Sequence, residues 1–335
     1  MKDRELMKRK VLLTGCAGFI GSNFVKKITL KKEVSAKHDF FILDALTYAG
    51  KYSHIQNEVE THPHLKFEQA DIRELARLQE IFAREKFDSV IHFAAESHVD
   101  RSIANPNIFV ETNVLGTLNL LQESVKLFEK NKDFKFLHIS TDEVYGSLKL
   151  EDPAFTEETP IAPNSPYSAS KASSDLLVRA FYETYKLPVL ITRCSNNYGP
   201  RQADEKFIPV VIKNALLNKK IPVYGAGMNI RDWIFVDDHN EGVWSVFNKG
   251  RVGEVYNLGG QSEMKNLDLA KKILQILGKP EGLIEFVTDR KGHDFRYAMD
   301  FSKAKNNLGW SPEHSFDSAL KITVDWYKNH FMVDK

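Results

Sequence analysis

The first 195 residues alternate short apolar segments with longer segments in which apolar residues recur every three or four positions. The short segments are rich in β-branched and aromatic residues and predict strands, whereas the longer ones predict helices. Six strands are expected, at residues 10–14, 40–43, 66–69, 89–93, 134–139 and 189–192, and four helices, at 19–30, 75–84, 108–129 and 169–185. Apolar strands joined by helical crossovers predict a doubly wound α/β fold of the Rossmann type, with a parallel sheet covered on both faces.

After about residue 200 the pattern changes to a helix at 209–217 and short strands near 222–224 and 234–236. Capped helices are expected to start after Asp237 and Asn266, and a final helix at 316–328 carries Leu320, Val324 and Tyr327 on one stripe. We therefore expect a nucleotide-binding domain at 1–195 and a smaller C-terminal α/β lobe for the substrate at 196–335. No Gly/Ser/Pro-rich linker marks the boundary, which leaves open a chain that crosses between the lobes.

Composition excludes several classes of function. The formal net charge is +1, so no overall field attracts nucleic acid or an anionic membrane. No apolar run reaches the roughly 18 residues that cross a bilayer, and the charged start, residues 1–10, lacks the features of a signal peptide. Two cysteines, Cys16 and Cys194, cannot form a zinc site unaided. We expect a cytoplasmic enzyme with no metal, nucleic-acid or membrane partner.

A glycine-rich segment, residues 14–21 (TGCAGFIG), follows the first strand and opens a helix. Gly15 permits a tight turn, Gly18 lets the backbone approach a pyrophosphate, and Gly21 allows the helix to pack closely. The free N–H groups at the helix N-terminus favour an anion. The segment predicts a dinucleotide-binding turn.

Acidic and small residues follow the next strands. Asp44 ends the second strand, 23 residues after Gly21, where a carboxylate accepts hydrogen bonds from the adenosine ribose. It would repel a 2′-phosphate, so NAD is favoured, and Lys51 is the nearby cation that leaves NADP open. Asp71 closes the third strand and Ala94 and Ala95 the fourth, at the edge where ligands bind. Asp71 could equally cap the next helix.

A tyrosine and a lysine lie four residues apart at the start of a long helix, in residues 167–171 (YSASK). This spacing puts Tyr167 and Lys171 on one face. A neighbouring ammonium would lower the pKa of the phenol, which suits Tyr167 for exchanging a proton with a substrate hydroxyl. Lys171 can also bond the nicotinamide ribose.

The segment 140–146 (STDEVYG) ends the fifth strand. Thr141 supplies the hydroxyl that an alcohol oxidation or a 4-epimerisation needs, and Asp142 and Glu143 follow it. Two acids beside a redox centre suggest a further proton abstraction and a protonated leaving group.

Eight segments resemble those of the dTDP-glucose 4,6-dehydratases, extended members of the short-chain dehydrogenase/reductase family. They are residues 14–21, 93–102 (FAAESHVDRS), 140–146, 165–175 (SPYSASKASSD), 194–200 (CSNNYGP), 230–236, 256–260 and 289–297. The likeness runs from about residue 9 to residue 330, and such enzymes feed deoxysugar biosynthesis.

The resemblance implies a redox-neutral lyase reaction on dTDP-glucose. Tyr167 would take the C4 hydroxyl proton during oxidation by NAD⁺, with Thr141 holding that oxygen. Glu143 would then take the C5 proton and Asp142 would protonate the departing C6 hydroxyl. Hydride return to C6 would give 4-keto-6-deoxyglucose.

The resemblance also implies two sets of binding residues and a homodimer built by pairing the helices at 108–129 and 169–185. NAD would be held by Phe19, Ile20, Asp44, Asp71, Ile72, Thr112, Tyr167, Lys171 and Asn197. The nucleotide-sugar site would comprise Ser97, Asn196, Lys206, Phe207, Tyr224, Arg231, Asn266, Arg290 and His293.

Departures from the family pattern bear on the choice of nucleotide. Residues 201–205 (RQADE) replace a more aromatic, proline-containing run, Phe207 stands where leucine is usual, and Lys291 and Phe295 replace a proline and an arginine. A UDP-linked sugar dehydratase and a nucleotide-sugar 4-epimerase are therefore the alternatives. Asp142 and Glu143 argue against the epimerase, which usually has small hydroxylated residues there.

Overall fold

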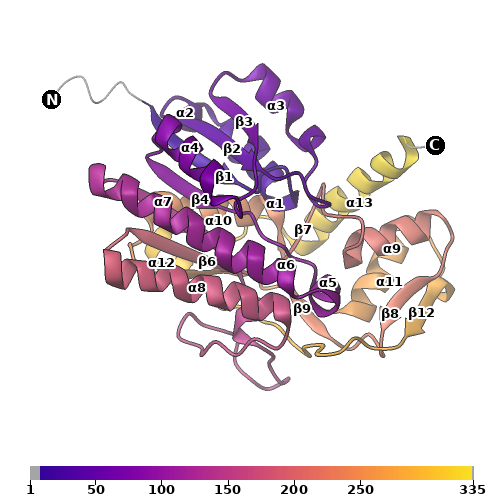
Figure 1. The fold of residues 1–335 in the computed structure, drawn as a ribbon. Helices are drawn as coiled ribbons and strands as arrows, with labels where there is room; N and C mark the ends of the chain where they lie inside the picture. The colour runs from indigo at the N-terminus through magenta and orange to yellow at the C-terminus, as the bar shows by residue number, and fades with distance from the viewer. Residues whose placement is uncertain (1–7, 334–335) are drawn as a thin grey trace.

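Seven parallel strands form the central sheet, in the order β10-β6-β5-β4-β1-β2-β3 (Figure 1). The computed structural model, which describes residues 8–333, places these strands at β1 (Arg9–Thr14), β2 (His38–Asp44), β3 (Leu65–Gln69), β4 (Ser89–His92), β5 (Lys135–Thr141), β6 (Val189–Cys194) and β10 (Val255–Leu258). Thr14 lies level with Leu43 of β2 and with His92 of β4, so neighbouring strands end at one edge. The doubly wound α/β prediction is confirmed.

The seventh strand was not expected from the sequence. β10 pairs in parallel with β6, with Val255 opposite Ile191. It is only four residues long and includes the buried amide of Asn257, so its apolar pattern is weak. The chain thus returns to the central sheet after it has begun the smaller lobe.

Helices cover both faces of this sheet. One face is covered by α1 (Phe19–Phe24), α2 (Lys32–Ser35), α3 (Gln56–Thr61), α10 (Val236–Lys249) and α12 (Ser302–Leu308), and the other by α4 (Leu75–Glu85), α7 (Thr117–Lys130) and α8 (Pro166–Tyr185). The short helices α5 (Val99–Ala104) and α6 (Asn107–Phe109) precede α7. Two hydrophobic cores result, one on each side of the sheet.

Two of the helices expected from the sequence contain π-helical stretches. Val25–Thr29 extends α1, and Val110–Gly116 joins α6 to α7. Such stretches are often found at functional sites. The second contains Thr112 and the buried Asn113, whose amide bonds both the backbone of Glu96 and the hydroxyl of Ser170.

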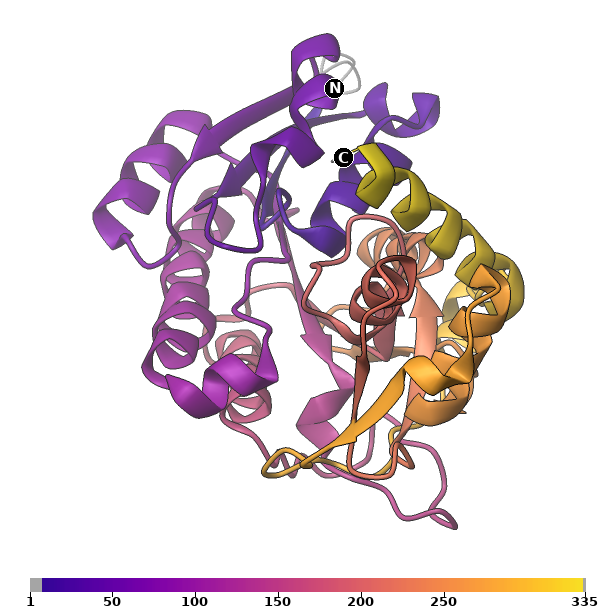
Figure 2. The ribbon, with the colours of Figure 1, turned by 90° about the vertical axis from the view of Figure 1, so that its right-hand side faces the viewer.

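The smaller lobe has its own core beside the carboxyl ends of the large sheet. It contains a three-stranded sheet of β7 (Asn196–Tyr198), β9 (Ile230–Phe235) and β11 (Glu263–Lys265), a parallel pair of β8 (Ile221–Tyr224) and β12 (Ile284–Val287), and the helices α9 (Phe207–Leu216), α11 (Asn266–Leu277) and α13 (Phe316–Val333). Phe19 and Ile20 at the start of α1 pack against this core. Figure 2 shows α13, in yellow, close to indigo helices from the first part of the described residues.

Two helix caps expected from the sequence are wrong. α10 begins at Val236 and α11 begins at Asn266, and neither receives a hydrogen bond from a capping side chain. Asp237 lies in the first turn of α10, where its carboxylate pairs with Lys27 at 3.3 Å. Inside the first turn a carboxylate still complements the positive end of the helix dipole, so it stabilises the helix without capping it.

The expectation that the chain has no signal peptide rested on residues 1–10. Of these, residues 1–7 lie outside the described residues. Within residues 8–333 no helix is both long and apolar enough to cross a membrane.

The apolar stripe of α13 yields a stability prediction. Leu320 is fully buried among α9 and α11, whereas Ile322 on the same helix is 45% exposed. Leu320→Ala should lower the free energy of unfolding by about 2–5 kcal/mol, because it deletes buried methyl groups and leaves a cavity. Ile322→Ala is the matched control and should change it by less than about 1 kcal/mol. Urea unfolding measures both, and equal losses would contradict this packing.

Candidate active site

One cavity of about 520 Å³ lies between the carboxyl edge of the large sheet and the smaller lobe. Pockets of roughly 300–1,000 Å³ are typical of sites that enclose small molecules. Every site residue predicted from the sequence lines this cavity: Gly15, Gly18, Phe19, Ile20, Gly21, Asp44, Asp71, Ile72, Ala94, Ala95, Ser97, Thr112, Thr141, Asp142, Glu143, Tyr167, Lys171, Asn196, Asn197, Lys206, Phe207, Tyr224, Arg231, Asn266, Arg290 and His293.

The glycine-rich turn is held by close backbone contacts. Gly15 has a φ of +74°, and a Cβ there would lie 2.4 Å from the Cα of Ala94. A Cβ on Gly21 would lie 2.5 Å from the Cα of Cys16. Gly18 differs, because its Cβ would meet only the Gly15 carbonyl oxygen, at 3.3 Å. Gly15 and Gly21 are thus required by packing, and Gly18 keeps an open backbone that fits the approach of a pyrophosphate.

Asp44 is fixed at the end of β2 by two backbone N–H groups. Its Oδ2 accepts from Ala17 and its Oδ1 from Leu46, both at 2.8 Å. Burial raises its pKa, and these two hydrogen bonds oppose the rise. Each carboxylate oxygen retains accepting capacity, so the group fits a ribose hydroxyl. Lys51, the cation that left NADP open, is not among the residues that line the cavity.

Asp71 does not cap α4, which begins only at Leu75. Its carboxylate instead accepts from the guanidinium of Arg73, at 2.9 Å from Nε and 2.6 Å from Nη2. Burial opposes ionisation of Asp71, but the hydrogen bonds from Arg73 outweigh it and lower the pKa. An ionised acceptor therefore lies at the carboxyl edge beside β3.

Tyr167 and Lys171 lie in the first turns of α8. This helix is started by a capping box between Ser165 and Ser168, with Pro166 in the first turn. Lys171 donates from Nζ to the carbonyl oxygen of Ile139 at 2.7 Å. The helix start thus fixes both side chains against the cavity wall.

The sequence predicted that Lys171 lowers the pKa of Tyr167. This prediction is wrong when only the side chains of the protein surround the phenol. Burial, followed by the charge of Glu143, raises the pKa of Tyr167 well above its usual value. Burial also lowers the pKa of Lys171 to about 8. The ammonium of Lys171 is directed at Ile139, so its field does not overcome burial at the phenol.

Thr141 ends β5 and starts the 3₁₀ turn Asp142–Tyr145, because its Oγ1 accepts from the backbone N–H of Glu143 at 3.3 Å. The same hydroxyl donates to Oδ1 of Asp142 at 3.2 Å. Oδ2 of Asp142 is buried and has no hydrogen-bond partner among residues 8–333, and the residue is 1% exposed. Burial, then the charges of Glu143 and Asp232, raise the pKa of Asp142 well above its usual value. This direction suits Asp142 to the role of a proton donor.

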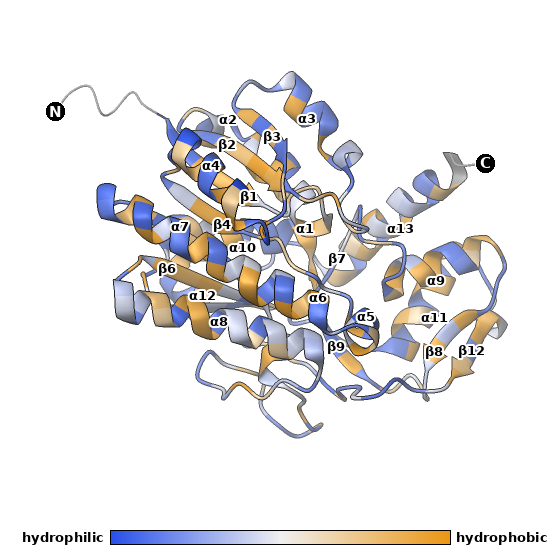
Figure 3. Cartoon of the chain, viewed as in Figure 1, coloured by the Kyte–Doolittle hydropathy of each residue, from blue (hydrophilic) through white to orange (hydrophobic). Residues whose placement is uncertain are grey.

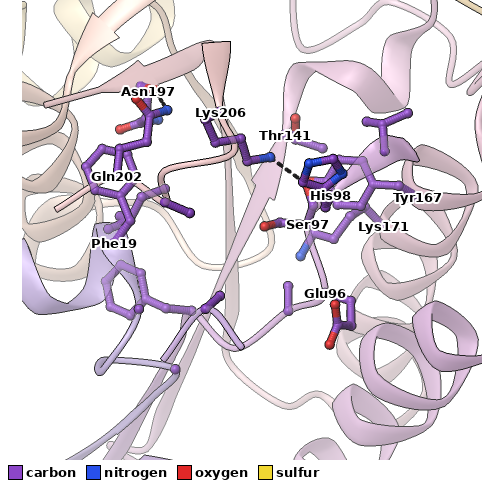
Figure 4. A pocket seen from close by; sticks show the side chains of 18 of the residues that line it. Phe19, Glu96, Ser97, His98, Thr141, Tyr167, Lys171, Asn197, Gln202 and Lys206 are labelled. Carbon is purple, nitrogen blue, oxygen red and sulfur yellow. Dashed lines mark hydrogen bonds between the residues drawn. The ribbon is translucent and has the colours of Figure 1, made fainter. Parts of the chain in front are cut away.

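Glu143 experiences a different field. Burial raises the pKa of Glu143 above its usual value, and the charges of Arg290, Lys206 and Arg231 oppose that rise without cancelling it. These three cations come from the smaller lobe. Figure 4 shows Lys206 reaching across the cavity towards Ser97, whose carbonyl oxygen accepts from Nζ at 2.9 Å. Two adjacent carboxyl groups in unlike environments can perform opposite proton transfers.

The smaller lobe also brings polar groups to the cavity that fit an anionic ligand. Arg231 is held by the carbonyl oxygen of Asp294 at 2.9 Å and lies over the Tyr297 ring at 4.3 Å. Nε of Arg290 is buried with no partner among the described residues. Guanidinium groups bind phosphate oxygens well. His293 is held by Asp289, with Nδ1 and Oδ1 2.6 Å apart.

Sequence reasoning missed several residues that line the cavity, among them Glu96, His98, Gln202, Glu205, Trp233 and Tyr297. Glu205 pairs with Arg101 at 2.8 Å, across 104 residues of sequence, and lies 3.7 Å from His98. The charged segment 93–102 could have indicated Glu96 and His98. It could not indicate that Glu205, far along the chain, lies beside this segment. Of the departures from the family pattern, Gln202, Ala203, Glu205 and Phe207 line the cavity, whereas Arg201, Asp204, Lys291 and Phe295 are not among its lining residues.

Comparisons with known proteins agree on one family. The sequence model of the GDP-mannose 4,6-dehydratase family matches residues 12–323. A dTDP-glucose 4,6-dehydratase of Xanthomonas campestris pv. campestris is 51% identical over 94% of this chain and 92% of its own length.

Solved structures agree with these relatives. A dTDP-glucose 4,6-dehydratase of Streptomyces venezuelae, solved with NAD bound, is 44% identical, covers 97% of this chain and 98% of its own, and has a TM-score of 0.91. A UDP-glucose 4-epimerase of Thermotoga maritima is 28% identical, with coverage of 96% and 99% and a TM-score of 0.86.

The raised pKa of Asp142 predicts a dependence of stability on pH. The unfolded carboxyl ionises near pH 4, whereas the folded one holds its proton to higher pH, so folding loses stability as pH rises between the two values. Asp142→Asn removes this penalty. Relative to wild type it should gain at most about 1.4 kcal/mol per pH unit in that window. Thermal midpoints measured from pH 5 to pH 8 test this, and a constant difference would contradict it.

Proposed function

This chain belongs to the dTDP-glucose 4,6-dehydratase family, and we propose that it converts dTDP-glucose into dTDP-4-keto-6-deoxyglucose and water with NAD⁺ as cofactor. The observation that carries the proposal is the pair of the buried Asp142 and the half-buried Glu143 in the wall of the cavity that Tyr167 and Lys171 also line. A single oxidation would need no such pair.

The residues of the large sheet fit NAD⁺. The open backbone at Gly18 suits the pyrophosphate, Asp44 the adenosine ribose and Lys171 the nicotinamide ribose, with Asp71 available to a donor on the adenine side. When bound, NAD⁺ supplies reversible redox chemistry, taking hydrogen with two electrons from the sugar at C4 and returning them at C6.

The side chains then divide the proton transfers among themselves. Thr141 holds the C4 oxygen and Tyr167 takes its proton as C4 becomes a ketone. The ketone acidifies the C5 hydrogen, and Glu143 takes it as general base. Asp142 gives its proton to the C6 hydroxyl, which leaves as water. Glu143 exchanges this proton with solvent and protonates C5 after C6 is reduced, so the overall change is the loss of one water.

The nucleotide-sugar would lie against the smaller lobe. Arg231 and Arg290 suit the diphosphate. The buried Oδ1 of Asn196 has no partner in the described part of the chain, so it suits a hydroxyl donor. Ser97, Lys206, Phe207, Tyr224, Asn266 and His293 complete the proposed contacts.

A test of the function is incubation of the purified protein with dTDP-glucose, followed by the alkali-induced absorbance of a 4-keto sugar. We expect this absorbance together with loss of the C6 hydroxyl. A 4-epimer with no keto sugar would overturn the proposal in favour of the epimerase alternative. UDP-glucose assayed in parallel reports how much the base contributes, because Gln202, Ala203 and Phe207 depart from the family pattern in the cavity wall.

The separate roles of the two acids can be tested with isotope exchange. Glu143→Gln should lose roughly 10²–10⁴-fold in turnover, because it removes the general base. It should also stop incorporation of solvent deuterium at C5. Asp142→Asn is the matched variant, and its defect should be milder with a 6-fluoro sugar, whose leaving group needs no proton. Normal exchange at C5 in Glu143→Gln would show that another group is the base.

We also propose that the protein is a homodimer and that it is cytoplasmic. Cys16 and Cys194 are buried and unpaired, which fits a reducing compartment. The helices α7 and α8 lie side by side, and Figure 3 shows hydrophobic segments on both. Val110, Leu115, Leu176 and Tyr185 on these helices and the adjoining π-helical stretch are each about half exposed. Pairing with a second copy would bury them.

Leu176 provides the test of this dimer, because it is 55% exposed on α8. Leu176→Glu should weaken self-association by more than about tenfold, since it would bury an unpaired charge. Phe286→Glu, at a residue 57% exposed on β12, is the control and should leave association unchanged. Light scattering measures both. A wild-type protein that stays monomeric at micromolar concentration would contradict the dimer.

A further inference from the structure

A buried group of charged side chains lies behind Lys171, outside the cavity lining. It consists of His138 on β5, Asp175 on α8 and Arg193 on β6, which are 0%, 2% and 5% exposed. None of the three is among the residues that line the cavity. The mechanism above uses none of them directly, although burying such groups is costly.

Distances link this group to Lys171 in a chain. Nε2 of His138 lies 3.4 Å from Nζ of Lys171 and 3.4 Å from Oδ1 of Asp175. Nε of Arg193 donates to Oδ2 of Asp175 at 2.9 Å. One carboxylate oxygen is thus fixed by Arg193, and the other faces the imidazole ring and has no hydrogen bond of its own.

The sequence spacing places Asp175 in register with the reacting residues. Tyr167, Lys171 and Asp175 recur every four residues on α8 and share one face of that helix. Lys171 is 4% exposed, so its ammonium is almost wholly removed from water. Beyond the carbonyl oxygen of Ile139, it needs a nearby negative charge to remain protonated.

We propose that Asp175, fixed by Arg193 and lying next to the His138 ring, is a positioning residue whose negative charge holds the Lys171 ammonium at the cavity wall. The inference rests on the proposed function, in which Lys171 serves Tyr167 and the cofactor. Asp175 touches neither, so it is not a catalytic residue.

The groups around Lys171 agree with this assignment. They are His92 from β4, His138 from β5, Cys194 and Arg193 from β6, and Asp175 and Tyr167 from α8. Burial raises the pKa of the Cys194 thiol and lowers that of His138 to about 4, so both are neutral at pH 7. Burial opposes ionisation of Asp175, but contacts with His138 and Arg193 lower its pKa to about 2. Asp175 therefore supplies the negative charge.

The sign of the effect follows from this arrangement. Because burial lowers the pKa of Lys171 to about 8, the ammonium is lost as pH rises through that value, and wild-type turnover should fall there. The fall in turnover on the alkaline side is the basic limb of the pH profile. Asp175→Asn leaves Arg193 as an unopposed positive charge and should move this basic limb to lower pH. Arg193→Gln leaves Asp175 unopposed and should move it to higher pH.

The experiment measures kcat and KM for dTDP-glucose from pH 6 to pH 10 in the full-length protein. Asp175→Asn should move the basic limb down by about one pH unit, which leaves roughly a tenth of the turnover above the limb. KM should stay near that of wild type, because Asp175 does not line the cavity. The double variant Asp175→Asn/Arg193→Gln has no buried charge left unpaired, so it keeps the test open if a single variant fails to fold. Its limb should lie between those of the single variants.

Asp238→Asn is the control for the loss of a buried carboxylate. Asp238 is 3% exposed, pairs with His314 at 2.8 Å and is not a cavity residue. It should lower the thermal midpoint and leave the limb in place. Limbs that stay at the wild-type pH in the Asp175 and Arg193 variants, or that move in the same direction, would overturn the inference. A wild-type protein that forms no keto sugar at any pH would instead overturn the proposed function.

Discussion

Two adjacent carboxyl groups in a buried wall cannot both be ionised unless positive charge stands close to one of them. Asp142 and Glu143 are in this position at the end of β5. Burial raises the pKa of both groups, but the charges of two acids add to the rise at Asp142, whereas three cations oppose it at Glu143. Asp142 is therefore the better proton donor and Glu143 the better proton acceptor, and the proposed dehydration depends on this difference.

The fold supplies the two environments from different halves of the chain. β5 of the large sheet carries Thr141 and the acid pair, and the smaller lobe carries Lys206, Arg231 and Arg290. The return of the chain to the large sheet through α10 and β10 joins the two parts. On the other side of the cavity, α8 holds Tyr167 and Lys171, with Asp175 and Arg193 behind them. Charge at this site is therefore arranged by the whole fold.

Much of this arrangement was predictable from sequence. The six strands were expected because apolar segments of five or so residues alternate with helical periodicity, and the glycine turn, Asp44, Tyr167 and Lys171 stand at fixed positions relative to them. β10 was missed because four residues that include Asn257 give little pattern. Long-range pairs were also out of reach, since Arg101 with Glu205 and Asp175 with Arg193 are set by tertiary packing. The expected lowering of the Tyr167 pKa was wrong because spacing on a helix does not reveal burial or the direction of an ammonium.

The central claim is that one active site oxidises C4, eliminates water between C5 and C6, and reduces C6 in a closed cycle. The most direct measurement is the position of a label in the product from dTDP-glucose carrying deuterium at C4, with NAD⁺ supplied in an amount no larger than that of the protein. The account predicts that the deuterium moves to C6 and that one solvent hydrogen enters at C5. Deuterium that is retained at C4, or is lost to solvent, would contradict it.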